Sequence, residues 1–216
     1  SILEEVLAFS MKGLEKEVII IEGNSKDGTR EIVREYEGRP GVSIIYEDKP
    51  HGKGAAVRAG IARVSGDFVL IQDGDLEYKV SDYPKVLEPV LTRKADICFG
   101  SRTLSSETRW QFRRFAGFER LYGLVVNLGG VLLTGLCNIL YGTSLSDGAT
   151  MFKVFPAGPL KKLKLNSDHF DYDWEIQGKL ARQGLRFAET PISYKARSRA
   201  EGKKIRFWRD GTKVLW

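Results

Sequence analysis

Three carboxylates at alternate positions form the stretch of the chain whose residue types most clearly suggest chemistry. Asp73, Asp75 and Glu77 directly follow residues 68–71, a β-branched and aromatic run that predicts a buried strand. Carboxylates held close together repel one another unless a hard divalent cation or a cationic substrate lies among them. Because ligands of α/β proteins bind at the carboxyl ends of strands, this pattern predicts a metal site. The alternative is a solvated acidic turn that caps the next helix.

Other polar residues also stand where a strand ends or a helix begins. Glu22 ends a predicted strand, and its two carboxylate oxygens could accept hydrogen bonds from a nucleobase edge. Lys53, between Gly52 and Gly54, combines a cation with bare backbone N–H groups that suit a phosphate. Arg102 follows another strand, and its planar fork can bond two phosphate oxygens. The plainer alternatives are a capped turn, a flexible helix entry and a surface salt bridge, respectively.

Strands and helices alternate through the first half of the chain. Near-continuous apolar strands between helices are typical of a parallel sheet that is covered on both faces. The second half predicts two more strands and a helix, and Asp147 and Glu175 are single acids there that could be purely structural. The predicted strands are 17–21, 42–46, 68–71, 96–100, 149–155 and 186–194, and the predicted helices are 2–11, 29–36, 51–64, 80–93 and 174–183.

The stretch 121–141 contains no charged residue and is long enough to cross a bilayer. It is only moderately apolar, because it holds four glycines and two asparagines. If Arg102 and Asp147, on either side of it, serve one site, a single crossing would separate them. We therefore expect a buried or interfacial helix whose basic flank faces anionic lipid. That flank comprises Arg109, Arg113, Arg114 and Arg120.

Composition indicates one globular domain with an anionic partner. The chain has 216 residues, 42% of them hydrophobic and 29% charged, which excludes a disordered protein. The net charge of +6 suggests phosphate groups, a membrane surface or nucleic acid as partner. Two histidines are too few for a zinc cluster, and Cys98 and Cys137 predict reduced thiols in a cytosolic-type environment.

Seven motifs in order resemble those of family-2 glycosyltransferases, most closely the dolichol-phosphate mannosyltransferase-like (polyprenyl-phosphate glycosyltransferase) branch. They are EGNSKDGT, GKGAAVRAGI, QDGDLEY, GSR, LSDGATMFKVF, the segment from WEI through ARQGLRFAETPISY, and RAEGKKIRFWRDG. The resemblance implies a GT-A (Rossmann-like) α/β fold with a mostly parallel sheet flanked by helices. It also implies inverting, metal-dependent transfer of a sugar from a nucleotide sugar, of the GDP-mannose or UDP-glucose type, to a polyprenyl or dolichyl phosphate.

The resemblance implies roles for residues on the nucleotide-sugar side of the site. Glu22 matches the acid that contacts the base, and Lys53 and Asp73 match residues beside the diphosphate. Arg197 and Lys203 match a late basic loop that closes on the diphosphate or the acceptor phosphate. Each of these five residues is therefore expected to bind the nucleotide sugar.

The metal and the reacting groups are implied in the same way. Asp73, Asp75 and Glu77 match the acids that hold Mg²⁺ or Mn²⁺, which would neutralise the departing diphosphate. Asp75, Arg102 and Asp147 are the expected catalytic residues, with Asp147 beside the acceptor. An acceptor phosphate monoester has a second pKa of about 6 and is already largely ionised at neutral pH. We therefore expect Asp147 to orient the acceptor more than to deprotonate it.

The acceptor side implies contact with a membrane. Arg113 and Arg114 match residues that bind the acceptor phosphate. We expect the protein on the cytoplasmic side of a membrane, attached peripherally or monotopically, with no nucleic-acid partner. Attachment to the membrane surface would depend on screened charge and therefore on salt.

One feature departs from the family pattern. Family members open with a strand that ends in a Pro-x-Tyr-Asn-Glu-like stretch, and this chain starts in what matches the following helix. We therefore expect residues 1–216 to form a single GT-A catalytic domain without its first strand and its C-terminal extension. The expected consequences are a gap beside strand 17–21, a helix 2–11 without a packing partner, and low stability.

Three other functions fit parts of the pattern. A family-2 transferase with a saccharide acceptor would need a true general base for the acceptor hydroxyl. A nucleotidyltransferase-like enzyme shares the sheet and the acids, but it would need a Gly-rich triphosphate loop that is not visible here. A non-catalytic basic fragment that binds lipid or nucleotide would show no metal dependence.

Overall fold

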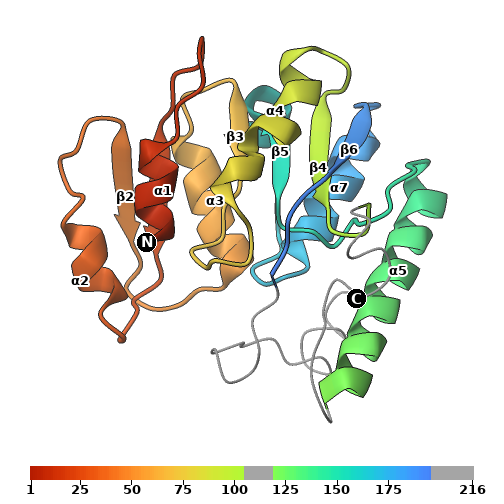
Figure 1. Cartoon of the computed structure of the whole chain (residues 1–216), viewed down its shortest axis with the longest axis horizontal. Helices are drawn as coiled ribbons and strands as arrows, with labels where there is room; N and C mark the ends of the chain where they lie inside the picture. Colours follow the sequence, from red (N-terminus) through yellow and green to blue (C-terminus); the bar gives the residue numbers. More distant parts are fainter. Residues whose placement is uncertain (105–118, 196–216) are drawn as a thin grey trace.

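The computed structural model describes residues 1–104 and 119–195, which form a mixed α/β fold (Figure 1). The strands are β1 (Val18–Glu22), β2 (Val42–Tyr46), β3 (Phe68–Leu70), β4 (Ile97–Ser101), β5 (Lys153–Pro156) and β6 (Phe187–Pro191). The helices are α1 (Ile2–Ala8), α2 (Thr29–Arg34), α3 (Lys53–Arg63), α4 (Tyr83–Leu91), α5 (Glu119–Tyr141), α6 (Ala157–Lys161) and α7 (Tyr172–Ala181), with a short 3-10 helix, η1, at Val80–Asp82.

The described strands form two sheets. β1 and β2 pair in parallel, from Val18 beside Val42 to Glu22 beside Tyr46. The second sheet has the order β3-β5-β4-β6, in which β5 runs antiparallel to both of its neighbours and β4 and β6 are parallel. In this sheet β3, β4 and β6 therefore point in the same direction and β5 is reversed between them, so the arrangement is mostly parallel with one antiparallel strand, as predicted.

The predicted gap beside the first strand is present as a break between the two sheets. Among the described strands, β1 pairs only with β2 and β3 pairs only with β5. One edge of β1 and one edge of β3 therefore have no strand partner there. Side-chain contacts bridge the break. The Glu17 carboxylate accepts the backbone N–H groups of Ser65 (2.6 Å) and Gly66 (2.8 Å), which precede β3.

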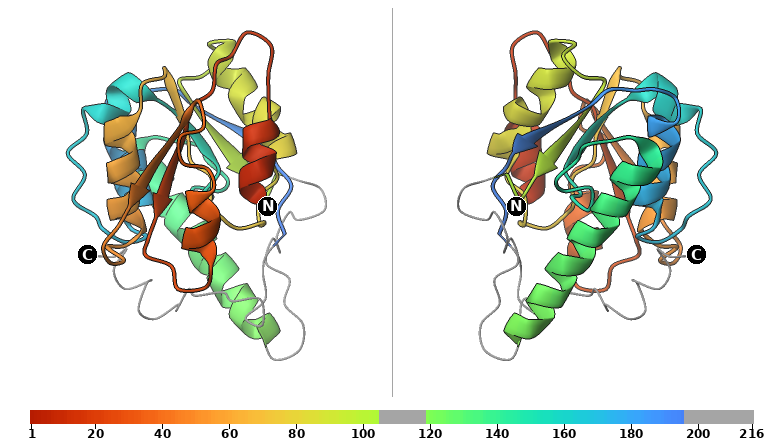
Figure 2. Two further views of the ribbon diagram at one scale, coloured as in Figure 1. Left: turned by 90° about the vertical axis from the view of Figure 1, so that its left-hand side faces the viewer. Right: turned by 90° about the vertical axis from the view of Figure 1, so that its right-hand side faces the viewer.

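Alternate residues of the strands face two different hydrophobic clusters. On β4, Ile97 and Phe99 join a cluster with residues of α3, α6 and α7, whereas Cys98 joins a cluster with residues of α4. These helices cover opposite faces of the sheet (Figure 2). Cys98 and Cys137 form no disulfide with each other, and burial raises the pKa of the Cys98 thiol to about 12.

Helix α1 corrects the expectation that it would have nothing to pack against. Ile2, Val6 and Phe9 pack on the cluster formed by α4 and its neighbours, and the Phe9 ring meets Tyr83 edge-on with centroids 5.0 Å apart.

The predicted helix 80–93 is divided into η1 and α4, with a proline at the start of α4 and Pro89 inside it.

Helix α5 runs along one side of the molecule and projects beyond the rest of the fold (Figure 2). Within the described residues, no helix is both long and apolar enough to cross a membrane. The carboxyl end of α5 is tied down by Asn138, whose side chain donates to the Leu145 carbonyl (2.7 Å) and accepts the Leu145 N–H (3.0 Å).

Candidate active site

The acidic motif lies directly after β3, as predicted, and its carboxylates have separate partners. Asp73 forms an ion pair with Lys53 at the start of α3. The Asp75 side chain accepts the Glu77 N–H (3.1 Å), and the Glu77 carboxylate accepts the Tyr194 hydroxyl (2.9 Å). In the described part of the chain, no three acidic, histidine or cysteine side chains form a group that could hold a metal. A metal site built from these acids therefore stays a prediction.

The start of α3 differs from the expected phosphate site. The N–H groups of Gly54 and Ala55 donate to the Asp168 carbonyl at 2.8 and 3.3 Å, so they are not bare. A side chain at Gly52 or Gly54 would collide with the loop that holds Asp168, which explains both glycines. The structure places the Lys53 ammonium against Asp73 of the acidic motif, but the backbone N–H groups beside it are already bonded.

Arg102 and Asp147 are brought together as a buried ion pair. The Arg102 Nε and Nη2 atoms donate to the two Asp147 carboxylate oxygens, each at 2.7 Å, and the Arg102 backbone N–H donates to the same carboxylate at 2.9 Å. Only 2% of the Arg102 side chain and 3% of the Asp147 side chain are exposed, so this is not a surface salt bridge. Burial alone would raise the pKa of Asp147, but Arg102 outweighs burial and holds that pKa below its usual value. The catalytic roles of both residues remain predictions.

Glu22 holds its own turn. It is 3% exposed, and its carboxylate accepts the N–H groups of Asn24 (3.2 Å) and Ser25 (2.7 Å). The Arg30 Nε atom lies 3.2 Å from the same carboxylate. These contacts are those of a capped turn at a strand end, and the base-binding role stays a prediction.

The segment after β6 contacts the last residues of the acidic motif. Tyr78 and Tyr194 form an isolated antiparallel bridge, and the Lys195 N–H donates to the Glu77 carbonyl at 3.0 Å. The Arg102 guanidinium lies 5.1 Å from the centre of the Tyr194 ring, which joins the motif to the buried ion pair. The predicted site residues Arg113, Arg114, Arg197 and Lys203 lie outside the described residues.

Sequence reasoning missed two charged residues near Asp147, the buried Lys153 and the half-buried Glu189. The Lys153 ammonium donates to Asp173 on α7 (2.5 Å) and to the Gly148 carbonyl (3.0 Å). Glu189 on β6 accepts the N–H groups of Ser146 and Asp147. A lysine inside the apolar run 149–155 was an available signal, because a strand charge that faces a core needs a partner.

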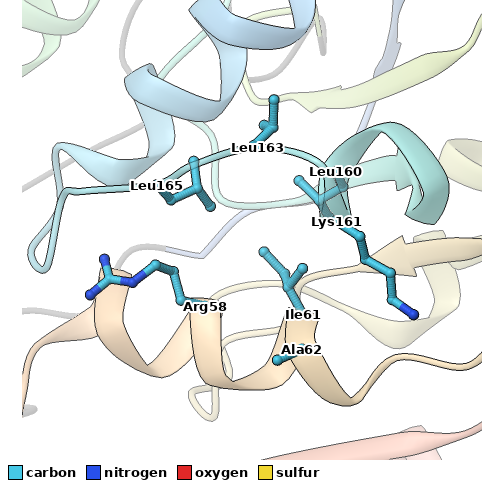
Figure 3. A pocket seen from close by; sticks show the side chains of 7 residues that line it. All are labelled: Arg58, Ile61, Ala62, Leu160, Lys161, Leu163 and Leu165. Carbon is cyan, nitrogen blue, oxygen red and sulfur yellow. The ribbon is translucent and has the colours of Figure 1, made fainter.

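The described residues also line a cavity of about 390 Å³ between α3 and the segment after β5 (Figure 3). Its lining comprises Arg58, Ile61, Ala62, Leu160, Lys161, Leu163 and Leu165. None of the predicted site residues belongs to it. Arg58 donates to the Ser167 carbonyl (2.6 Å) and pairs with Asp168, so its charge is already compensated. The candidate active site is therefore at the sheet edge rather than in this cavity.

Comparison with known proteins identifies the class to which this fold and site belong. The model of glycosyl transferase family 2 matches residues 1–155, so the chain belongs to glycosyltransferase family 2. The solved glucosyl-3-phosphoglycerate synthase of Mycobacterium tuberculosis, in complex with Mn²⁺, UDP and glucosyl-3-phosphoglycerate, aligns with a TM-score of 0.62 and 18% identity. That alignment covers 95% of this chain and 68% of the other, and it shows a GT-A fold.

Two relatives belong to the predicted branch of this family. The chain is 27% identical to a dolichyl-phosphate beta-glucosyltransferase of Trichomonas vaginalis, over 88% of this chain and 57% of that protein. It is 25% identical to the dolichol-phosphate mannosyltransferase of Pyrococcus furiosus, over 90% of this chain and 52% of that protein. The chain thus spans little more than half the length of each relative.

Proposed function

We propose that the protein transfers a hexose from a nucleotide sugar to a polyprenyl or dolichyl phosphate, with inversion and with the help of Mg²⁺ or Mn²⁺. One observation carries the proposal: the acidic motif and the Arg102–Asp147 pair meet at one edge of a GT-A sheet, joined through Tyr194. The family match and the names of the two relatives support the same reaction.

The donor side of the site fits a divalent cation by its chemistry. Asp73 and Asp75 offer hard oxygen ligands, and the Lys53 ammonium already lies against Asp73, so this carboxylate is placed to accompany a positive charge. A bound ion would neutralise the diphosphate as it leaves. If Asp73 held a metal, the Lys53 ammonium would be available to the diphosphate, where a fixed cation would stabilise developing negative charge.

The acceptor side needs orientation more than proton removal. Asp147 is ionised and held by Arg102, which makes it a poor proton acceptor. A phosphate monoester, with a second pKa of about 6, needs no strong base to react as a nucleophile. The buried pair therefore suits an enzyme whose acceptor is a lipid phosphate better than one whose acceptor is a sugar hydroxyl.

Contact with a membrane surface is part of the proposal. Large apolar side chains on the described part of α5 are exposed to solvent, whereas Asn127 and Thr134 on the same helix are buried. The exposed residues are Leu128, Val131, Leu132, Leu136, Ile139 and Leu140. A helix face of this kind can lie in the interface of a bilayer that holds the lipid acceptor.

The test is a transfer assay with the full-length protein. Radiolabelled GDP-mannose and UDP-glucose are each incubated with a polyprenyl phosphate, in Mn²⁺, in Mg²⁺ and in excess chelator. We expect a labelled lipid product from one donor that disappears in chelator. A product formed equally well in chelator would contradict the metal dependence, and transfer only to a saccharide would contradict the acceptor.

A further inference from the structure

A carboxylate from a distant strand holds the loop that carries Asp147. Glu189, on β6, accepts the Ser146 N–H at 2.6 Å with one oxygen and the Asp147 N–H at 2.9 Å with the other. Glu189 lies beside Phe99 of β4 in the sheet register. A single side chain therefore fixes two consecutive peptide groups relative to the sheet.

Further contacts hold the same loop at Gly148 and at the Ser146 side chain. The Gly148 N–H donates to the Thr134 hydroxyl of α5 at 3.1 Å, and the Gly148 carbonyl accepts from Lys153 at 3.0 Å. The Ser146 hydroxyl lies 2.8 Å from the Ser101 hydroxyl. Glu189 differs from these partners because it accepts the Asp147 N–H; the Asp147 carbonyl accepts only a local bond, from the Thr150 N–H at 3.4 Å, in the part of the chain that the structure describes.

The proposed reaction makes no direct use of Glu189. Its two oxygens are already occupied by backbone N–H groups, and it lies in the sheet rather than in the acidic motif. Asp147, in contrast, reaches Arg102 with both of its carboxylate oxygens. A shift of the 146–147 backbone would therefore move the Arg102–Asp147 pair as a unit.

We infer that Glu189 is a positioning residue for the acceptor side of the site: it sets the place of Asp147 and Arg102 through the 146–147 backbone. This inference rests on the proposed function, because it assigns the pair to the acceptor phosphate. Binding of the nucleotide sugar does not depend on Glu189, since no described contact of Glu189 reaches the acidic motif.

The test compares Glu189→Gln with a matched control in the full-length protein. Glutamine has nearly the same shape as glutamate, but an NH₂ group that cannot accept a backbone N–H takes the place of one carboxylate oxygen. Glu17→Gln is the control, because Glu17 also accepts two consecutive N–H groups, those of Ser65 and Gly66, away from the acidic motif and the Arg102–Asp147 pair. Steady-state kinetics are measured with a short-chain polyprenyl phosphate and with the nucleotide sugar varied in turn.

We expect Glu189→Gln to lower kcat/KM for the polyprenyl phosphate by about 10- to 100-fold, as displacements of about 1 Å in an active site do. The KM for the nucleotide sugar should stay within about twofold of the parent, and Glu17→Gln should change neither value by more than this. A merely structural role would instead lower kcat alone through a smaller active fraction, with both KM values unchanged.

Three further outcomes would overturn the inference. Unchanged acceptor kinetics in Glu189→Gln would exclude the positioning role while leaving the proposed function intact. An equal rise in the KM of donor and acceptor would show that Glu189 supports the whole site. Failure of the unsubstituted protein to use any polyprenyl phosphate would remove the proposed function, and the inference with it.

Discussion

Two buried charges that need each other dominate the site at the level of single residues. Taking an arginine and a carboxylate out of water is costly, and bidentate hydrogen bonds such as those between Arg102 and Asp147 recover that cost only while both partners are present. Removing one partner leaves an uncompensated charge. Any single substitution in this pair is therefore expected to change both the free energy of unfolding and the activity. A double substitution is needed to separate the two effects.

We predict that Asp147→Leu lowers the free energy of unfolding by about 3–5 kcal/mol, the usual cost of breaking a buried pair from one side. Arg102→Met combined with Asp147→Leu should recover most of this loss, because apolar residues of similar volume replace buried pairs well. Urea unfolding measures both values. The double variant should fold and yet transfer no sugar; transfer at the parental rate would contradict the catalytic role of the pair.

We predict that Asp75→Asn abolishes metal-dependent binding of a nucleoside diphosphate and leaves the fold intact. The amide keeps the shape of the carboxylate but loses the charge that a hard cation requires. Calorimetric titration with nucleotide in Mn²⁺ measures the effect. Asp67→Asn, at the opposite end of β3, is the control and should bind like the parent. Equal binding by Asp75→Asn would remove Asp75 from the metal site.

The sequence identified most residues of the candidate site but not how they interact. Arg102 and Asp147 were both named as residues of one site, yet nothing in their spacing predicts that each satisfies the other. Glu189 was missed for the same reason, since its partners are more than 40 residues away in the chain. Local patterns reveal which residues can do chemistry, whereas partners across the fold depend on strand order.

At the scale of single elements, α5 places polar residues inward and apolar residues outward. Asn127 and Thr134 are 4% and 3% exposed, whereas Ile139 is 83% exposed. In a helix that faces water the opposite arrangement is expected. The sequence predicted a helix over 121–141 without charged residues, but not that its apolar face would point away from the protein, because a helical period does not say which face packs on the rest of the fold.

We predict that Leu132→Glu combined with Ile139→Glu weakens binding to vesicles of anionic phospholipid by at least about tenfold, since burying one such side chain is worth about 1.5–3 kcal/mol. Co-sedimentation measures the bound fraction. Ile32→Glu is the control, because Ile32 is an exposed apolar residue of α2, and it should bind like the parent. Unchanged binding of the α5 variant would show that this helix does not contact the bilayer.

At the scale of the whole molecule, the break between the two sheets is the main feature. The edges of β1 and β3 that face the break lack strand partners among the described residues. The Glu17 contacts bridge only one end of the break. β1 and β3 are mostly half-buried. A backbone group on these edges that is removed from water without gaining a partner would cost about 1–3 kcal/mol, against the net stability of about 5–15 kcal/mol that a domain usually has.

We predict that this chain unfolds at low temperature, because the edges of β1 and β3 that face the break have no strand partner among the described residues. An apolar strand added before Ser1 to pair with these edges should raise the melting temperature and strengthen nucleotide binding. Calorimetry compares it with a Gly/Ser-rich extension of equal length. A high-melting 216-residue chain, or equal effects of both extensions, would contradict this prediction.

Strand order in the second sheet also has a consequence for synthesis. β3 and β4 leave the ribosome before β5, although β5 lies between them and supplies hydrogen bonds to both. At about 5–20 residues per second, the interval from the end of β4 to the end of β5 lasts about 3–10 s. During that interval two apolar strands have open edges, which are sites for wrong pairing and for chaperones. Substitutions that delay the docking of β5 will therefore lower the yield of folded protein even where the finished fold is equally stable.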